Sequence, residues 1–114
     1  MANLIALRLS GKTYALTLTT APTTAALLVE SETNVQTNFV ALLNTGSDTA
    51  AVELANTSDT VKTPAIASSG SGGSFVLPGG MTQPVVIAAP KAPFYIKGIS
   101  SGSNTLYITP IQSD

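Results

Sequence analysis

Short runs rich in Thr, Val, Ile, Leu and Tyr, separated every few residues by Gly or Pro, fill most of this sequence. These side chains suit the pleated, half-buried surface of a strand, whereas Gly and Pro favour turns and strand ends. Short strands bury an apolar face only by pairing, so the pattern predicts an all-β protein. No segment forms a convincing helix, and the best candidate, of about two turns, is TTAALLVESE at residues 23–32.

Residues 4–9 and 12–18 are predicted to form a first hairpin across a two-residue turn at Ser10 and Gly11. Such turns favour glycine because their central residues adopt positive φ. The pairing gives one mostly apolar face, which we expect to lie on the core.

A second hairpin is predicted for residues 38–44 and 49–54, across a turn at 45–48. The residues that this register places on the inner face are Phe39, Ala41 and Leu43, opposite Leu54, Val52 and Ala50. A slip of one residue would mix the two faces, so the pattern favours this register. Val40 and Leu42 then point outward, and as apolar outer positions they are candidate protein-contact residues.

A third hairpin is predicted for residues 94–99 and 105–110, across a loop at 100–104. The residues of its inner face are Phe94, Ile96, Leu106 and Ile108, and the outward cluster consists of Tyr95, Lys97 and Tyr107. Tyrosine is favoured at interfaces because it combines a large contact area with a polar tip. The cluster is therefore a candidate subunit contact or sugar-stacking patch, the alternative being an ordinary cross-strand trio on a solvated face.

Two further strands, at 74–77 and 84–89, flank a turn signal at Pro78, Gly79 and Gly80. The total of about eight or nine short strands predicts one antiparallel β-sandwich or jelly roll. We expect a single domain over residues 1–114.

The Gly/Ser-rich stretch Ser68–Ser74 raises the question of a phosphate-binding loop. Such a loop needs a Gly-Lys-Ser/Thr ending that opens a helix, whereas Gly73 is followed by Ser74, Phe75 and a strand. The dinucleotide fingerprint also fails, because Phe75 stands where its third glycine belongs. We therefore predict a flexible surface loop at 68–74 within one domain.

The chain contains neither His nor Cys. It therefore lacks the commonest general base, the thiolate nucleophile and the preferred zinc ligands. Glu30 and Glu32 would share a strand face and are the candidate pair for a metal or glycosidase site, although two solvated charges at a strand end explain them better. We predict no enzyme activity, no cofactor and no metal site.

Charged residues make up only 10% of the chain, and the net charge is −1. The five basic residues are scattered, whereas a nucleic-acid binder needs a basic stripe. No apolar run approaches the roughly 20 residues of a membrane helix, and the first residues lack the basic start of a signal peptide. We expect neither a nucleic-acid nor a membrane partner. The low charge fits either a surface that meets other protein or a small domain that tolerates it.

The segments NFVALLNTGSDTAAVEL (38–54) and SFVLPGGMTQPVVIAAPKAPFYIKGISSGSNTLYITP (74–110) resemble small structural proteins of tailed-phage virions, of the head-decoration or cement type. The resemblance extends over roughly the last two-thirds of the chain. It implies a β-rich protein without catalytic residues that binds the outside of an icosahedral head, often as a trimer at threefold positions.

The predicted function is therefore that of a capsid decoration protein. Its expected partners are the major capsid protein and further copies of itself, with a trimer favoured. Its expected location is the virion, after assembly in the host cytoplasm. Two alternatives stay open: a tail, baseplate or head-tail connector component, and a carbohydrate-binding β-sandwich. The aromatic content of 5% and the lack of Trp disfavour the sugar-binding alternative.

Overall fold

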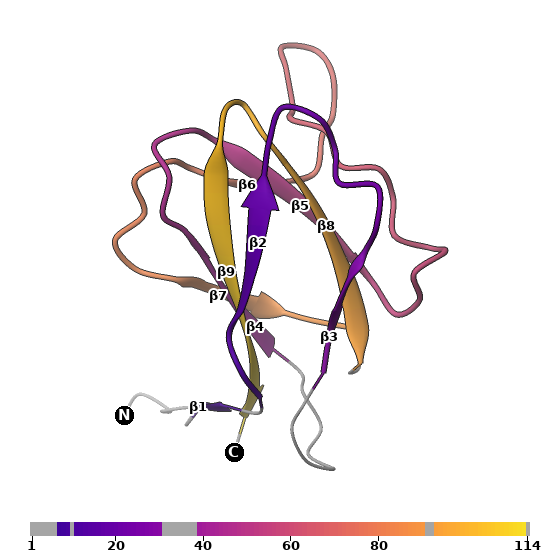
Figure 1. Cartoon of the computed structure of the whole chain (residues 1–114), viewed down its shortest axis with the longest axis vertical. Helices are drawn as coiled ribbons and strands as arrows, with labels where there is room; N and C mark the ends of the chain where they lie inside the picture. The colour runs from indigo at the N-terminus through magenta and orange to yellow at the C-terminus, as the bar shows by residue number, and fades with distance from the viewer. Residues whose placement is uncertain (1–6, 10, 31–38, 91–92, 114) are drawn as a thin grey trace.

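The computed structural model of the chain describes residues 7–9, 11–30, 39–90 and 93–113. These residues form nine strand segments and no helix, arranged as two antiparallel sheets packed face to face (Figure 1). The five-stranded sheet contains β1 (Leu7–Leu9), β2 (Tyr14–Leu18), β9 (Asn104–Ser113), β4 (Phe39–Asn44) and β7 (Val85–Ala88). The four-stranded sheet contains, in order, β3 (Leu27–Val29), β8 (Phe94–Ser100), β5 (Ala50–Ala55) and β6 (Phe75–Leu77). The prediction of an antiparallel β-sandwich is confirmed.

The strands β1 and β2 follow each other along the same edge of β9. Leu9 lies opposite Ile111, and Tyr14 lies opposite Ile108. Four residues therefore separate Leu9 from Tyr14, whereas two residues separate their partners on β9. The extra residues interrupt the edge between β1 and β2. The predicted first hairpin is therefore wrong: both strands run antiparallel to β9, so they point the same way and do not pair.

The chain changes sheet at almost every connection. Among the described strands, β5 and β6 are the only consecutive pair that share a ladder. β4 and β9 lie in the five-stranded sheet, whereas β5 and β8 lie in the other. The second and third predicted hairpins are therefore wrong as pairs. Side chains alternate between the two faces of any strand, whether the following strand pairs with it in the same sheet or lies in the opposite sheet across the core. The sequence pattern therefore could not show which of these two arrangements the chain adopts.

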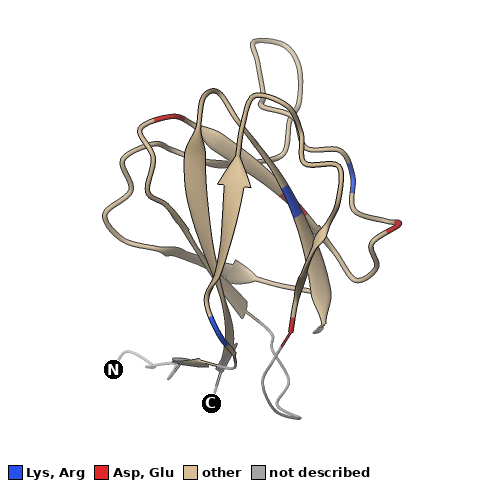
Figure 2. Cartoon of the chain, viewed as in Figure 1, with Lys and Arg blue, Asp and Glu red and all other residues tan. Residues whose placement is uncertain are grey.

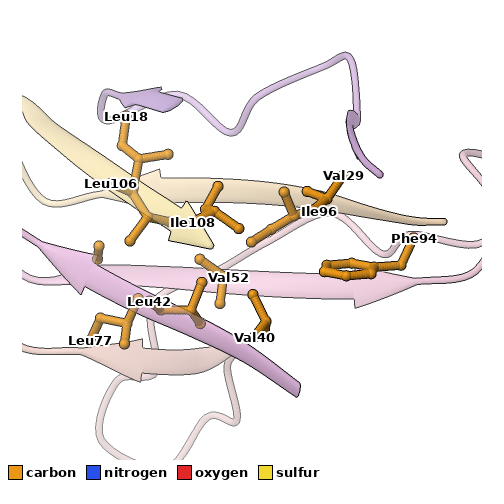
Figure 3. Packing of buried hydrophobic residues seen from close by; sticks show 11 residues of the cluster. Leu18, Val29, Val40, Leu42, Val52, Leu77, Phe94, Ile96, Leu106 and Ile108 are labelled. Carbon is orange, nitrogen blue, oxygen red and sulfur yellow. The ribbon is translucent and has the colours of Figure 1, made fainter. Parts of the chain in front are cut away.

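One apolar core fills the space between the sheets (Figure 3). Its buried members are Leu18, Val29, Val40, Leu42, Ala50, Val52, Leu77, Phe94, Ile96, Leu106 and Ile108. The inner faces predicted for residues 94–99 and 105–110 are confirmed, because Phe94, Ile96, Leu106 and Ile108 are all fully buried.

The inner face of β4 is the opposite of the one predicted. Val40 and Leu42 are both 0% exposed and point into the core, so the prediction that they are outward contact residues is wrong (Figure 3). Residues 39–43 are all apolar, so either alternating set could face inward. The predicted choice rested on pairing β4 with β5, and it failed with that pairing.

The candidate helix at 23–32 is also wrong over its described part. Leu27–Val29 form the edge strand β3, which pairs with residues 94–96 of β8. Val29 is fully buried in the core. A strand at this position completes the four-stranded sheet and gives its backbone ladder partners on β8.

A buried polar network ties the ends of several strands together. The Asn44 side-chain amide donates hydrogen bonds to the carbonyl oxygens of Asp48, Leu77 and Pro78, at 2.9, 3.3 and 3.2 Å. Its Oδ1 accepts a bond from the Gly46 amide at 3.2 Å. One 0% exposed side chain thus links the end of β4 to the β4–β5 turn and to the end of β6.

Asn104, at the start of β9, extends this network to the β8–β9 connection. Its amide nitrogen donates to the Asp48 carbonyl and, at 2.9 Å, to the buried Ser100 hydroxyl. A Cβ on Gly46 would overlap the Asn104 side chain, so glycine is required there for close approach. Ser100 also accepts a bond from the Gly102 amide at 3.1 Å, which completes the turn that leads into β9.

The Gly/Ser segment forms a closed turn that projects from the sandwich between β5 and β6 (Figure 1). Ser68 and Ser71 exchange backbone hydrogen bonds, and the Ser74 amide donates to the Ala65 carbonyl at 2.8 Å. Gly70 has a φ of 80°, a conformation in which glycine is favoured. The segment continues directly into β6.

We expect Leu42→Ala to lower the free energy of unfolding by about 2–5 kcal/mol, because it removes a fully buried side chain from a closed core. Leu43→Ala, the same change one residue on, should lower it by about 1 kcal/mol, because Leu43 lies on the other face of β4 and is only half-buried. Urea unfolding of both variants measures the difference. A larger loss for Leu43→Ala would restore the originally predicted inner face of β4.

We expect Asn44→Ala to lower the free energy of unfolding by about 2–4 kcal/mol, because it leaves buried carbonyl groups without their donor. Asn44→Asp keeps the side-chain volume but removes the donors, and should be at least as destabilising. Gln83→Ala, at an exposed position, should change stability by about 0.5 kcal/mol or less. Thermal unfolding of the three variants tests this, and full stability of Asn44→Asp would show that the network contributes only by its volume.

Candidate interaction surface

The outer face of the five-stranded sheet carries no charged residue on four of its strands. β2, β4, β7 and β9 contain none, whereas β5 and β8 of the other sheet contain Glu53 and Lys97 (Figure 2). We define the outer face by the side chains that alternate with the core residues or border the hollow described below: Leu9, Thr13, Ala15, Thr17, Phe39, Ala41, Leu43, Val86, Ala88, Thr105, Tyr107, Thr109 and Ile111. All are apolar, threonine or tyrosine.

A groove of about 460 Å³ hollows the middle of this face. The residues that line it are Leu9, Thr13, Ala41, Leu43, Thr45, Pro84, Tyr107, Thr109 and Ile111. The register explains the hollow: Ala41 lies opposite Thr109, two small side chains, while larger residues flank them along both strands. On one side Leu43 lies opposite Tyr107, and on the other Ile111 lies opposite Leu9. The floor is thus small and the walls are large.

The groove is surrounded by apolar side chains that face solvent. Leu9 is 73% exposed, Val86 40% and Tyr107 39%. Among the described residues, these are three of the five large apolar side chains with this degree of exposure. The other two, Phe75 and Val76, lie on β6 of the other sheet.

The threonines of the outer face make hydrogen bonds within the protein. The hydroxyls of Thr13 and Thr109 lie 2.8 Å apart and bond to each other. The Thr45 hydroxyl, at the end of the groove, donates to the Thr105 carbonyl at 3.1 Å. Because these hydroxyls already have hydrogen-bond partners, a ligand in the groove would not have to supply hydrogen bonds to them. The groove therefore suits an apolar protein surface.

The predicted cluster of Tyr95, Lys97 and Tyr107 does not exist. Tyr107 lies on the outer face of the five-stranded sheet, at the groove. Tyr95 and Lys97 alternate with the buried residues of β8, so they lie on the outer face of the four-stranded sheet. The core separates the two sets. Each residue was correctly predicted to point outward, but the cluster assumed a ladder between β8 and β9 that does not form.

Leu9, Ala41, Leu43, Thr109 and Ile111 were not predicted as contact residues. Two of them, Ala41 and Leu43, were assigned to the core by the predicted pairing of β4 with β5, in a strand that is apolar on both sides. The feature of the sequence that could have identified them is the lack of a polar side in this strand. One face of such a strand packs on the core, so its other face is also apolar and points away from the core.

The candidate acidic pair is only partly within the described residues. Glu30 is exposed just after β3, and its backbone amide donates to the Tyr14 hydroxyl at 3.2 Å. Glu32 lies outside the described residues. In the part of the chain that the structure describes, no three acidic, His or Cys side chains gather closely enough to hold a metal ion. The same part contains no helix of a length and hydrophobicity that could cross a membrane.

Comparisons with protein-family models, with curated proteins and with solved structures found no match for this chain.

Proposed function

We propose that this protein is a structural component of a phage virion, of the capsid decoration type, and that it works by protein–protein contact through its outer face. The observation that carries the proposal is the uncharged, hollowed outer face of the five-stranded sheet. The sequence resemblance to virion proteins supplies the specific setting. The expected partners are the capsid shell and further copies of the same chain.

The composition of the outer face supports a contact role. The centres of protein interfaces are depleted of charge and enriched in large apolar and aromatic side chains. Here Leu9, Val86 and Tyr107 stay exposed around a groove without a charged residue in its lining. Removing such apolar area from water favours association and offsets part of the entropy that the partners lose on binding. A partner that covers this face would therefore bind without having to desolvate or pair any charge.

The lengths of the edge strands favour contact through the face over contact through an edge. The edge strands β3 and β6 of the four-stranded sheet have three residues each, and β7 has four. The remaining edge is divided between β1 and β2, with three and five residues. Short and interrupted edges offer few free backbone groups to an added strand. The central strands β4 and β9 instead present their outward side chains over six and ten residues.

We expect Thr109→Glu to weaken association at least tenfold, because it places a carboxylate on the floor of the apolar groove. Thr63→Glu makes the same change at an exposed position between β5 and β6 and should have no effect. Light scattering over a concentration series measures self-association, and co-sedimentation with capsid shells that lack decoration protein measures shell binding. Circular dichroism checks that both variants are folded.

The oligomer and its partner separate the alternatives. A trimer that binds shells supports the decoration role, whereas a larger ring without shell affinity would favour a tail or connector component. If Thr109→Glu associates and binds shells like the wild type, the outer face is not the contact. A wild-type monomer that binds glycans and ignores shells would overturn the virion proposal.

A further inference from the structure

A methionine sulfur helps to hold the β6–β7 loop, residues 78–84, against the β4–β5 turn (Figure 1). The Gly80 amide of the loop donates a hydrogen bond to the Gly46 carbonyl of the turn at 2.7 Å. The next residue of the loop, Met81, accepts a bond at its Sδ from the backbone amide of Asn44, with a nitrogen–sulfur distance of 3.5 Å. The loop is thus attached through one backbone bond and one bond to sulfur, next to the buried polar network.

The sulfur serves as acceptor for a buried amide that lies beyond the end of a ladder. The Thr45 amide donates to a carbonyl of β9, so the preceding amide, that of Asn44, points to the β7 side of β4. The ladder between β4 and β7 ends where Leu42 lies opposite Val85, two residues before Asn44. Asn44 is 0% exposed, and a buried amide needs an acceptor. Met81 supplies it.

The position of Met81 makes this bond sensitive to the chemistry of its sulfur. Its side chain packs against the apolar core, and the residue is half-buried on a surface loop, so a small oxidant reaches it in the folded protein. A thioether combines apolar packing with a weak acceptor. Oxidation adds an oxygen to the same sulfur and makes the side chain polar, which disfavours its packing against the core.

We propose that Met81 is an oxidation site for peroxides, and that its sulfoxide releases the β6–β7 loop from the β4–β5 turn. In this step a lone pair of the sulfur forms the new S–O bond while the O–O bond of hydrogen peroxide breaks, and water leaves. The thioether is oxidised by two electrons and the peroxide is reduced by two. Methionine sulfoxide reductases reverse the change, so the release is reversible.

The same loop forms one end of the groove. Pro84, its last residue, and Thr45, next to Asn44, both line the groove. Release of the loop therefore changes the shape of the groove at this end. We expect oxidation to weaken association, a consequence that rests on the proposed contact role of the outer face, whereas the oxidation site does not.

Amide hydrogen exchange before and after treatment with hydrogen peroxide tests the proposal, and peptide mass spectrometry locates the sulfoxide. We expect oxidation of Met81 in the folded protein and exchange about tenfold faster or more at the Asn44 and Gly80 amides, because their part of the structure opens locally. The Ile96 amide, in the other sheet between β3 and β5, should exchange at an unchanged rate. Reduction of the sulfoxide should restore slow exchange.

Met81→Leu is the matched control, because it keeps an apolar side chain of similar size but has neither the acceptor nor the oxidisable sulfur. Its Asn44 amide should exchange fast without peroxide, and peroxide should leave every rate in the loop unchanged. A response of this variant to peroxide would assign the effect to another residue.

Three results would overturn the proposal. Met81 that is oxidised only after unfolding is not a site in the folded protein. A sulfoxide that leaves exchange at Asn44 and Gly80 slow does not release the loop, and equal acceleration at Ile96 would show global destabilisation instead. Light scattering of the oxidised protein separates this inference from the proposed function. Fast local exchange with unchanged association supports the oxidation site and removes only its effect on the groove.

Discussion

The hydrogen bonds that Asn44 and Asn104 direct at the β4–β5 turn are the interaction on which the rest of the sandwich depends. Both amides donate to the Asp48 carbonyl, one from the end of β4 and the other from the start of β9. These bonds add to the backbone hydrogen bonds of the same turn, in which the Thr45 amide donates to the Thr105 carbonyl and the Gly46 carbonyl accepts from the Gly80 amide. Buried amides with all their bonds made specify one arrangement, because any shift leaves several polar groups unsatisfied at once.

The placement of β4 and β5 in different sheets also explains why the five-stranded sheet has an apolar outer face. Because β4 and β5 face each other across the core, β4 is paired on both sides by β7 and β9 within its own sheet. Val40 and Leu42 then lie in the core at 0% exposed, and the alternate residues Ala41 and Leu43 lie on the other side of β4, where Ala41 is 8% exposed and Leu43 is half-buried. A strand that is apolar on both sides thus gives one face to the core and turns a second apolar face away from it.

The sequence pattern predicted the strands and the facing of β8 and β9, but not their partners. The alternation from Phe94 to Ile108 contains a clear polar side, so its inner face could be assigned before the pairing was known. The run Phe39–Leu43 contains no polar side, and its facing depended on a hairpin that does not form. Likewise, Tyr95 and Tyr107 were placed together because a short loop joins their strands. A short loop restricts the distance between strand ends, and it does not decide whether the strands share a sheet.

The low charge of the chain acquires a specific meaning once the charges are placed on the fold. A weakly charged domain could distribute its few charges evenly over its surface. A partner that covered any of its faces would then have to bury a charged side chain. Here Glu53 and Lys97 lie opposite each other on the four-stranded sheet, while β2, β4, β7 and β9 have none. In the five-stranded sheet the charged residue Arg8 lies on the short strand β1, and β2, β4, β7 and β9 can be covered without burying a charge of their own. This local lack of charge, more than the overall composition, is what favours a protein that functions as part of an assembly.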